Sequence, residues 1–212
     1  LQLEALWQQR IYRHLGRRPK TARRTIRRLP ARLRTDARYT TTALQRLFEL
    51  SAQTRITKRS RLRAGRAQPA DKLMCHYRDA QRRFGVGWHV LAAVNLVETG
   101  FNRLRNDSVA GAQGPMQFIP STWRAYGMGG NVHDPRDAIM GAANYLKASG
   151  APGDYRRALF AYNPSSLYVS AVLNHARRMA HDRRAFYSYY AWQIFVRTRT
   201  GERRLTGPEP RE

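Results

Sequence analysis

The chain has 212 residues, which is long enough for one hydrophobic core and an accessory element. It contains no run of 18 apolar residues, so we expect no transmembrane helix. The formal net charge is +25, and residues 1–70 hold 19 of the 39 basic residues but only 3 of the 14 acidic ones. This imbalance indicates either a solvated basic surface or attraction to a polyanion, which could be an anionic polymer, a lipid surface or nucleic acid.

The first 70 residues predict three helices followed by a linker. The helices cover residues 2–15, 20–34 and 36–50, with Asp36 as the expected N-cap of the third. Residues 51–69 lose helical periodicity and gain Arg, Gly and Pro, which is typical of a linker or an extended arm.

Two of these helices have distinctive faces. The first ends at Gly16 and is amphipathic. Its apolar face carries Leu3, Trp7, Ile11 and Leu15. The second is dense in arginine, and pairs four residues apart, such as Arg23 and Arg27, repel each other on a helix. Its apolar side is marked by Ile26, Leu29 and Leu33.

From residue 71 the pattern changes to a series of short helices with short loops. Aspartates at 71, 134 and 154 are expected N-caps, and glycines such as Gly85 and Gly100 are expected C-caps. The predicted helices cover 71–84, 88–98, 120–127, 134–150, 154–162 and 165–179. Such a series predicts a compact all-α domain.

The C-terminal tail is aromatic and rich in β-formers. Residues 186–199, a turn at 200–202 and a return at 203–205 predict a short β-hairpin packed on the helical domain. Aromatic side chains here could instead stack on sugars or lie at a membrane interface.

Cysteine and histidine residues show no pattern of a metal centre. The single Cys75 cannot form an intrachain disulfide, and its helical context predicts a small buried apolar residue. His76, His89, His133 and His175 share no metal-ligand spacing. We therefore expect neither a metal nor a cofactor.

Glu98 lies in the last turn of the apolar helix 88–98, just before Gly100. A carboxylate there faces the negative end of the helix dipole, and burial adds to this effect, so the pKa of Glu98 should rise. A general acid that works near neutral pH needs such a pKa. Glu98 is also the only glutamate between Glu49 and Glu202. We predict that Glu98 is a catalytic acid.

A loop rich in small residues follows, with the sequence S-V-A-G-A-Q-G-P-M-Q from Ser108 to Gln117. Small residues allow a backbone to approach a ligand closely. Met116 and Gln117 offer an adaptable apolar contact and an amide.

At these two motifs the sequence resembles the catalytic domain of the soluble lytic transglycosylases, which have a goose-type-lysozyme-like fold. That family reads E-S-G at the acid and G-A-x-G-L-M-Q in the loop. Here Thr99 stands for the serine and keeps its hydroxyl, while Pro115 stands for the leucine.

Two later stretches carry the same resemblance. Residues 134–146 follow the family's D-P-x-x-N-I-x-A-G-A-x-Y-L pattern, and residues 158–163 follow A-L-x-A-Y-N. The family then continues A-G-x-G, whereas this chain has Pro164-Ser165-Ser166, which changes one expected cleft wall. The resemblance covers roughly residues 71–181.

The resemblance implies cleavage of the β-1,4 bond between N-acetylmuramic acid and N-acetylglucosamine in peptidoglycan. Glu98 would act first as acid and then as base, closing a 1,6-anhydromuramyl ring without water or metal. Ordinary glycoside hydrolysis uses two carboxylates, and the nearest candidate for a second one, Asp107, lies in a polar loop where a turn role is expected. The resemblance also implies a set of substrate-binding residues: Thr99, Ser108, Gly114, Met116, Gln117, Tyr162 and Asn163. In the family the counterpart of Tyr162 hydrogen-bonds the catalytic acid, whereas Asn163 can equally be a helix C-cap.

Two other functions stay open at this point. One is a muramidase that cleaves the same bond with water, and the other is a non-catalytic protein that binds the cell wall or a polyanion. Peptidoglycan strands are the expected partner, with anionic wall polymers or a membrane surface as candidates for residues 1–70; nucleic acid is not expected. We expect a basic N-terminal segment at 1–70, a lysozyme-like domain at 71–183 and an aromatic tail at 184–212. Because the chain starts with Leu1, we expect a processed or trimmed chain in which any signal peptide is not visible. The resemblance implies a protein that is secreted or lies in the cell envelope.

Overall fold

The computed structural model describes residues 2–53, 63–198 and 201–207. This part of the chain forms ten helices and one two-stranded antiparallel sheet, which confirms the predicted mainly α class. The helices are α1 (Gln2–Gly16), α2 (Pro19–Arg28), α3 (Ala31–Gln53), α4 (Ala70–Phe84), α5 (Trp88–Thr99), α6 (Pro120–Tyr126), α7 (Pro135–Ala148), α8 (Tyr155–Tyr162), α9 (Ser166–His181) and α10 (Arg184–Tyr190). None of them is both long and apolar enough to cross a membrane.

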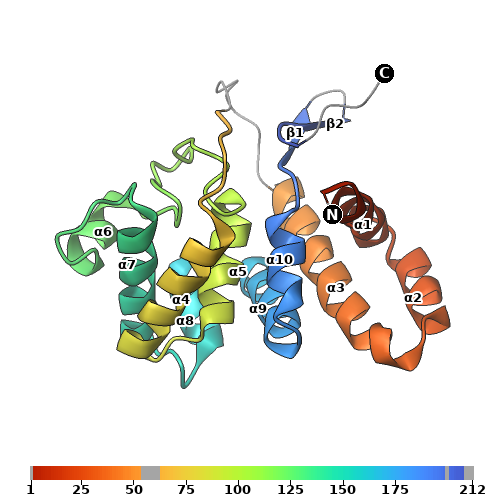
Figure 1. Cartoon of the computed structure of the whole chain (residues 1–212), viewed down its shortest axis with the longest axis horizontal. Helices are drawn as coiled ribbons and strands as arrows, with labels where there is room; N and C mark the ends of the chain where they lie inside the picture. The colour runs from red at the N-terminus through yellow and green to blue at the C-terminus, as the bar shows by residue number, and fades with distance from the viewer. Residues whose placement is uncertain (1, 54–62, 199–200, 208–212) are drawn as a thin grey trace.

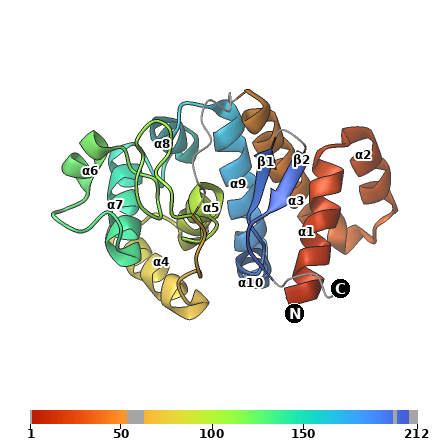
Figure 2. The ribbon, with the colours of Figure 1, turned by 90° about the horizontal axis from the view of Figure 1, so that it is seen from above.

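Helix α9 occupies the middle of the molecule, between α5 on one side and α3 on the other (Figures 1 and 2). The hydroxyl of Ser165 caps its first turn by accepting from the backbone N–H of Tyr168. Its apolar side chains point to both neighbours, since helical spacing places them around most of the helix. Leu44 of α3 therefore belongs to the same hydrophobic core as Leu73 of α4 and Met179 of α9.

The basic segment folds as three helices, but the second and third differ from the prediction. Helix α2 stops at Arg28 because Pro30 disfavours helical geometry in the residue before it, and α3 starts at Ala31. Asp36 thus lies inside α3 and not at its start. Its carboxylate pairs instead with Arg178 and His181 of α9.

The amphipathic face predicted for α1 points away from the core. Leu3, Trp7 and Ile11 are 61%, 63% and 55% exposed, and only Leu15 of that face is buried. The rotation of α1 is fixed by a buried amide: Gln9 donates to the carbonyl of Gln193 (2.8 Å) and accepts from its N–H (2.9 Å). A buried amide needs such partners, which explains why Gln9 and not Trp7 faces inward.

The tail contains the predicted hairpin, but its first half is helical. Strand β1 (Phe195–Thr198) pairs with β2 (Gly201–Arg204), so that Phe195 lies opposite Arg204. Residues 186–190, expected in the β-region, belong to α10, because Phe186 and Tyr189 recur at helical spacing and are buried together. Of the turn expected at 200–202, Gly201 and Glu202 belong to β2 instead, and residues 199 and 200 lie outside the described residues.

The structure also bears on the expectations for Cys75 and for the linker at 51–69. Cys75 is exposed, not buried, because it lies on the outer face of α4. Of the predicted linker, residues 51–53 extend α3 and 54–62 lie outside the described part. Residues 63–65 run beside the segment after Glu98, with Gly65 N–H donating to the carbonyl of Arg103 (2.8 Å) and Arg105 N–H to that of Arg63 (3.0 Å).

Candidate active site

Glu98 lies in the last turn of α5, as predicted. Gly100 ends the helix in the left-handed conformation at φ 59°, where a Cβ would approach Cδ1 of Ile194 to 2.4 Å. The Glu98 side chain is half-buried at the end of this apolar helix. Burial raises its pKa to about 7, against a smaller lowering by a hydrogen bond from Tyr168. Glu98 can therefore both release and accept a proton near neutral pH.

The hydroxyl that contacts Glu98 belongs to Tyr168 and not to Tyr162. Tyr168 lies in the first turn of α9 and donates to Oε1 of Glu98 over 2.6 Å. Tyr162, at the end of α8, donates instead to the carbonyl of Met116 (2.6 Å). The hydrogen bond to Glu98 that we expected from Tyr162 is therefore made by Tyr168, on the next helix.

Sequence reasoning missed Tyr168, although a signal was present. Tyr168 is one of the buried residues of α9, whose other buried residues are apolar except for His175. A buried tyrosine hydroxyl nearly always needs a hydrogen-bond partner. That rule alone marks Tyr168 as a residue with a polar neighbour in the core.

Thr99 lies beneath the loop that follows Glu98. It is 1% exposed, donates to the carbonyl of Pro115 (2.8 Å) and accepts from the backbone N–H of Asn102 (3.0 Å). Asn95, one turn earlier, donates to the same carbonyl (2.8 Å) and accepts from the hydroxyl of Tyr77 (2.6 Å). These bonds fasten the loop to the end of α5, and Asn95 is a further residue that the sequence analysis missed.

The remaining loop residues differ in how deeply they are buried. Gly114 has φ 71°, and a Cβ on it would lie 2.0 Å from the carbonyl oxygen of Val132. Met116 is fully buried, while Gln117 is half-buried at φ 52° with its amide donating to the carbonyl of Gly114 (2.9 Å). Ser108 is exposed and its hydroxyl accepts from Ala112 N–H (2.9 Å).

The structure brings Glu98 near Tyr162 of the 158–163 motif, and the ring of Tyr162 lies 5.7 Å from that of Tyr145 of the 134–146 motif. Burial raises the pKa of Tyr162, and the nearby charge of Glu98 raises it further, so these two side chains are close. Asn163 is the half-buried C-cap residue of α8. The substrate contacts expected of Tyr162, Asn163 and the loop stay predictions.

No second carboxylate perturbs Glu98 within the described part of the chain. Its pKa follows from burial and from Tyr168, with no contribution from a neighbouring acid. Asp107, the nearest candidate in sequence, is exposed. The described residues also contain no group of three or more His, Cys, Asp or Glu side chains that could hold a metal ion.

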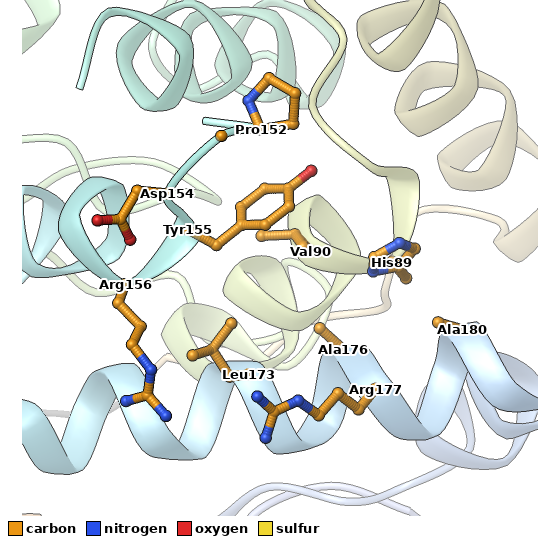
Figure 3. Close-up of a pocket in the computed structure, with 11 residues that line it drawn as sticks. His89, Val90, Pro152, Asp154, Tyr155, Arg156, Leu173, Ala176, Arg177 and Ala180 are labelled. Atoms are coloured by element: carbon orange, nitrogen blue, oxygen red, sulfur yellow. The ribbon is translucent and has the colours of Figure 1, made fainter. Parts of the chain in front are cut away.

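A separate hollow of about 280 Å³ lies at the other end of α5 (Figure 3). His89 and Val90 line it, nine and eight residues before Glu98, which is about 13 Å along a helix. Figure 3 shows Arg156 and Arg177 on the same side of this hollow. Glu98 does not line it, so this hollow is distinct from the candidate active site.

Comparison with known proteins identifies the family of this chain. The family described as "Transglycosylase SLT domain" matches residues 76–183, which is half of the chain. The chain belongs to the transglycosylase SLT domain family. The match runs from within α4 to just beyond α9 and includes Glu98, the loop and Tyr168. The lysozyme-like helical fold expected from the sequence fits this membership.

A curated relative of this SLT domain is the membrane-bound lytic murein transglycosylase F of Thiobacillus denitrificans (strain ATCC 25259 / T1). It is 33% identical over 81 residues, which are 38% of this chain and 17% of the relative. The chain therefore spans less than a fifth of that relative's length. No solved structure matches the chain.

Proposed function

We propose that this SLT domain is a peptidoglycan lytic transglycosylase that cleaves the β-1,4 bond between N-acetylmuramic acid and N-acetylglucosamine. The observation that carries the proposal is the half-buried Glu98, whose pKa is raised to about 7 and which Tyr168 contacts. A single carboxyl group with this pKa suits a reaction in which the same residue must first give and then take a proton.

In the proposed first step, protonated Glu98 donates its proton to the glycosidic oxygen. The bond from that oxygen to C1 of the muramyl residue breaks, and the N-acetylglucosamine part leaves with a free hydroxyl. The substrate's own acetamido group supports the positive charge at C1, which replaces the second carboxylate of ordinary glycosidases.

In the proposed second step, the Glu98 carboxylate takes the proton of the muramyl C6 hydroxyl. The C6 oxygen then bonds to C1 and closes the 1,6-anhydro ring. Glu98 ends protonated, as it began, so no water is consumed. The hydroxyl of Tyr168 orients the carboxyl oxygen for both steps and stabilises the carboxylate that the first step forms.

A muramidase would use the same acid but add water at C1. Digestion of purified peptidoglycan separates the two reactions by mass spectrometry, because the anhydro product is lighter by one water. We expect the anhydro product from the wild-type protein. Hydrated ends as the main product would make it a muramidase, and the absence of soluble fragments would leave a binding protein.

Glu98→Gln is the matched control for this digestion. Glutamine keeps the shape of the side chain but cannot donate the proton, and general acid–base catalysis contributes about 10²–10⁴-fold. We expect turnover to fall by about that factor. Activity above a tenth of the wild-type value would show that Glu98 is not the acid.

This function places the protein in the cell envelope, where peptidoglycan is its partner. The name of the relative, a membrane-bound murein transglycosylase, supports this location. Fractionation of cells that express the full-length protein, followed by detection with an antibody, tests it; recovery with cytoplasmic proteins would contradict it.

A further inference from the structure

A basic groove lies between α2 and α3, outside the part of the chain that matches the SLT family. It is an open hollow of about 560 Å³. Its walls carry five cationic side chains and no acidic one: Lys20, Arg23, Arg24, Arg27 and Arg38. Ile26, which is buried, forms the floor. We call this the α2 groove.

The cations of the α2 groove have no counter-charge in the described residues, where no ion pair or hydrogen bond involves their side chains. Other arginines of the N-terminal segment have acidic partners: Arg13 and Arg17 share Glu202, and Arg46 pairs with Glu49. Repulsion between Arg23 and Arg27, one helical turn apart, is therefore left uncompensated. An external anion would remove this repulsion and release counterions.

The spacing of the cations indicates what kind of anion fits. Lys20, Arg23 and Arg27 follow one another at three and four residues, which is a charge about every 4.5–6 Å along the helix axis. Guanidinium groups bind phosphate oxygens in pairs of hydrogen bonds. A flexible chain with a phosphodiester every few bonds matches both the spacing and the chemistry.

The lining of the groove argues against two other polyanions. No aromatic side chain lines it, whereas proteins that bind single-stranded nucleic acid usually stack bases on aromatic rings. A membrane presents a plane of headgroups, which does not enter a hollow, and membrane-bound helices insert apolar side chains beside their cations. The exposed apolar residues of α1, such as Trp7, do not line the groove.

We propose that the α2 groove binds a flexible phosphodiester polymer that lacks aromatic bases. This inference does not depend on the proposed function, because it concerns binding alone. In both views α2 lies at the end of the molecule opposite α6, with α5 and its Glu98 between them (Figures 1 and 2). Changes in the groove should therefore leave the candidate active site intact.

The test measures binding of the full chain to synthetic poly(glycerol phosphate) by titration at several salt concentrations. The groove variant replaces Lys20, Arg23, Arg24 and Arg27 with glutamine. The control variant removes the same charge from exposed residues of other elements by replacing Lys72, Arg78, Arg157 and Arg183 with glutamine. Circular dichroism shows whether the fourfold variant folds. If it does not, the double variant Arg23→Gln with Arg27→Gln replaces it in the titration, because this double change removes a repulsion and should not destabilise α2.

We expect the groove variant to bind at least about 10-fold more weakly than the control variant. The slope of log K against log salt should also become shallower by about 0.7 for each phosphate that the groove no longer neutralises, the value for a single-stranded polyanion. Equal binding by the two fourfold variants would overturn the proposal, because net charge alone would then explain the affinity.

Two further ligands test the two alternatives that the lining argues against, single-stranded nucleic acid and a membrane. Binding to single-stranded DNA that is tighter than to the glycerol polymer and that depends on the groove would overturn the proposal in favour of nucleic acid. Groove-dependent binding to vesicles of anionic phospholipid, without binding to the polymer, would overturn it in favour of a membrane. Weak binding to both supports the phosphodiester polymer.

Discussion

The hydroxyl of Tyr168 donates a 2.6 Å hydrogen bond to Oε1 of Glu98 across 70 residues of sequence. The bond joins the first turn of α9 to the last turn of α5. It acts on the pKa of Glu98 in the direction opposite to burial, since it favours the charged carboxylate while burial favours the neutral acid. The balance of the two leaves Glu98 with a pKa of about 7.

Replacing Tyr168 with phenylalanine should move the pH dependence of turnover. Without the hydroxyl the charged form of Glu98 is less stable, so its pKa rises above its present value of about 7. The rate that requires the protonated acid should then decline at a higher pH, by about one to two pH units, because a hydrogen bond to a charged group contributes roughly 1.5–3 kcal/mol. A profile of kcat/KM against pH measures the shift.

Tyr162→Phe is the matched control for this measurement. It removes a hydroxyl that donates to the carbonyl of Met116 and not to Glu98. We expect a lower rate from a looser loop, with the alkaline limb moved much less than in Tyr168→Phe. If Tyr162→Phe gave the larger shift, the hydrogen bond to the acid would be assigned to the wrong tyrosine.

Glu98→Gln should change how stability depends on pH. In the folded protein the pKa of Glu98 is about 7, above the ordinary value of 4.5, so between these pH values the folded state keeps a proton that the unfolded state has lost. The Glu98 contribution is therefore fully present below about pH 4.5 and is lost as the pH rises to about 7. Glutamine, which stays neutral, should remove this decline and gain on the order of 3 kcal/mol over wild type at pH 8 relative to pH 4.

Urea unfolding at both pH values measures this difference. Asp107→Asn is the control, because it neutralises an exposed carboxylate of the following loop. It should keep the pH dependence of the wild type. A Glu98→Gln protein with that same dependence would show that burial does not raise the pKa of Glu98.

Thr99→Val should loosen the loop beneath the site, whereas Thr99→Ser should not. Valine fills the space but leaves the N–H of Asn102 without its partner and takes one of two donors from the carbonyl of Pro115. Serine keeps the hydroxyl. We expect valine to lower the free energy of unfolding by about 1–3 kcal/mol and to reduce turnover. Similar stability of both variants in thermal unfolding would contradict this role.

The sequence predicted many of the parts of the fold that depend on neighbours along the chain, although Asp71, an expected N-cap, lies in the first turn of α4, whose N-cap residue is Pro69. Asp134, Asp154 and Ser165 cap the helices that follow them, and Gly100 ends α5 just after Glu98. Each of these signals acts within one helical turn. The position of the acid followed from them.

The parts that the sequence did not predict depend on contacts between distant residues. The rotation of α1 is fixed by Gln9 and Gln193, which are 184 residues apart, and an amphipathic pattern cannot anticipate such a pair. Tyr162 and Tyr168 are both tyrosines near the same motif, and only the packing of α9 against α5 decides which reaches Glu98. The helix α10 resulted from tertiary burial of aromatic residues that favour strands in isolation.

Leu44→Ala tests whether residues 1–70 fold apart from the SLT domain. Leu44 is 5% exposed in the core that also contains Met179 of α9. We expect a loss of about 2–5 kcal/mol in a single cooperative unfolding transition that near-UV circular dichroism and tryptophan fluorescence report together. Leu33→Ala, at a side chain that is 43% exposed, should cost less than about 1 kcal/mol. Two separate transitions, only one of them moved by Leu44→Ala, would support the predicted boundary near residue 70.

The packing of α3 along α9 fixes the distance and direction from the α2 groove to Glu98. A binding module on a flexible linker lets its enzyme sample a volume that grows with linker length, so that many bonds near the anchor become accessible. A module that is held on rigid helices does not give its enzyme this freedom. Under both proposals, a polymer bound in the groove would leave within reach of Glu98 only those glycan strands that lie at a fixed distance and orientation from that polymer.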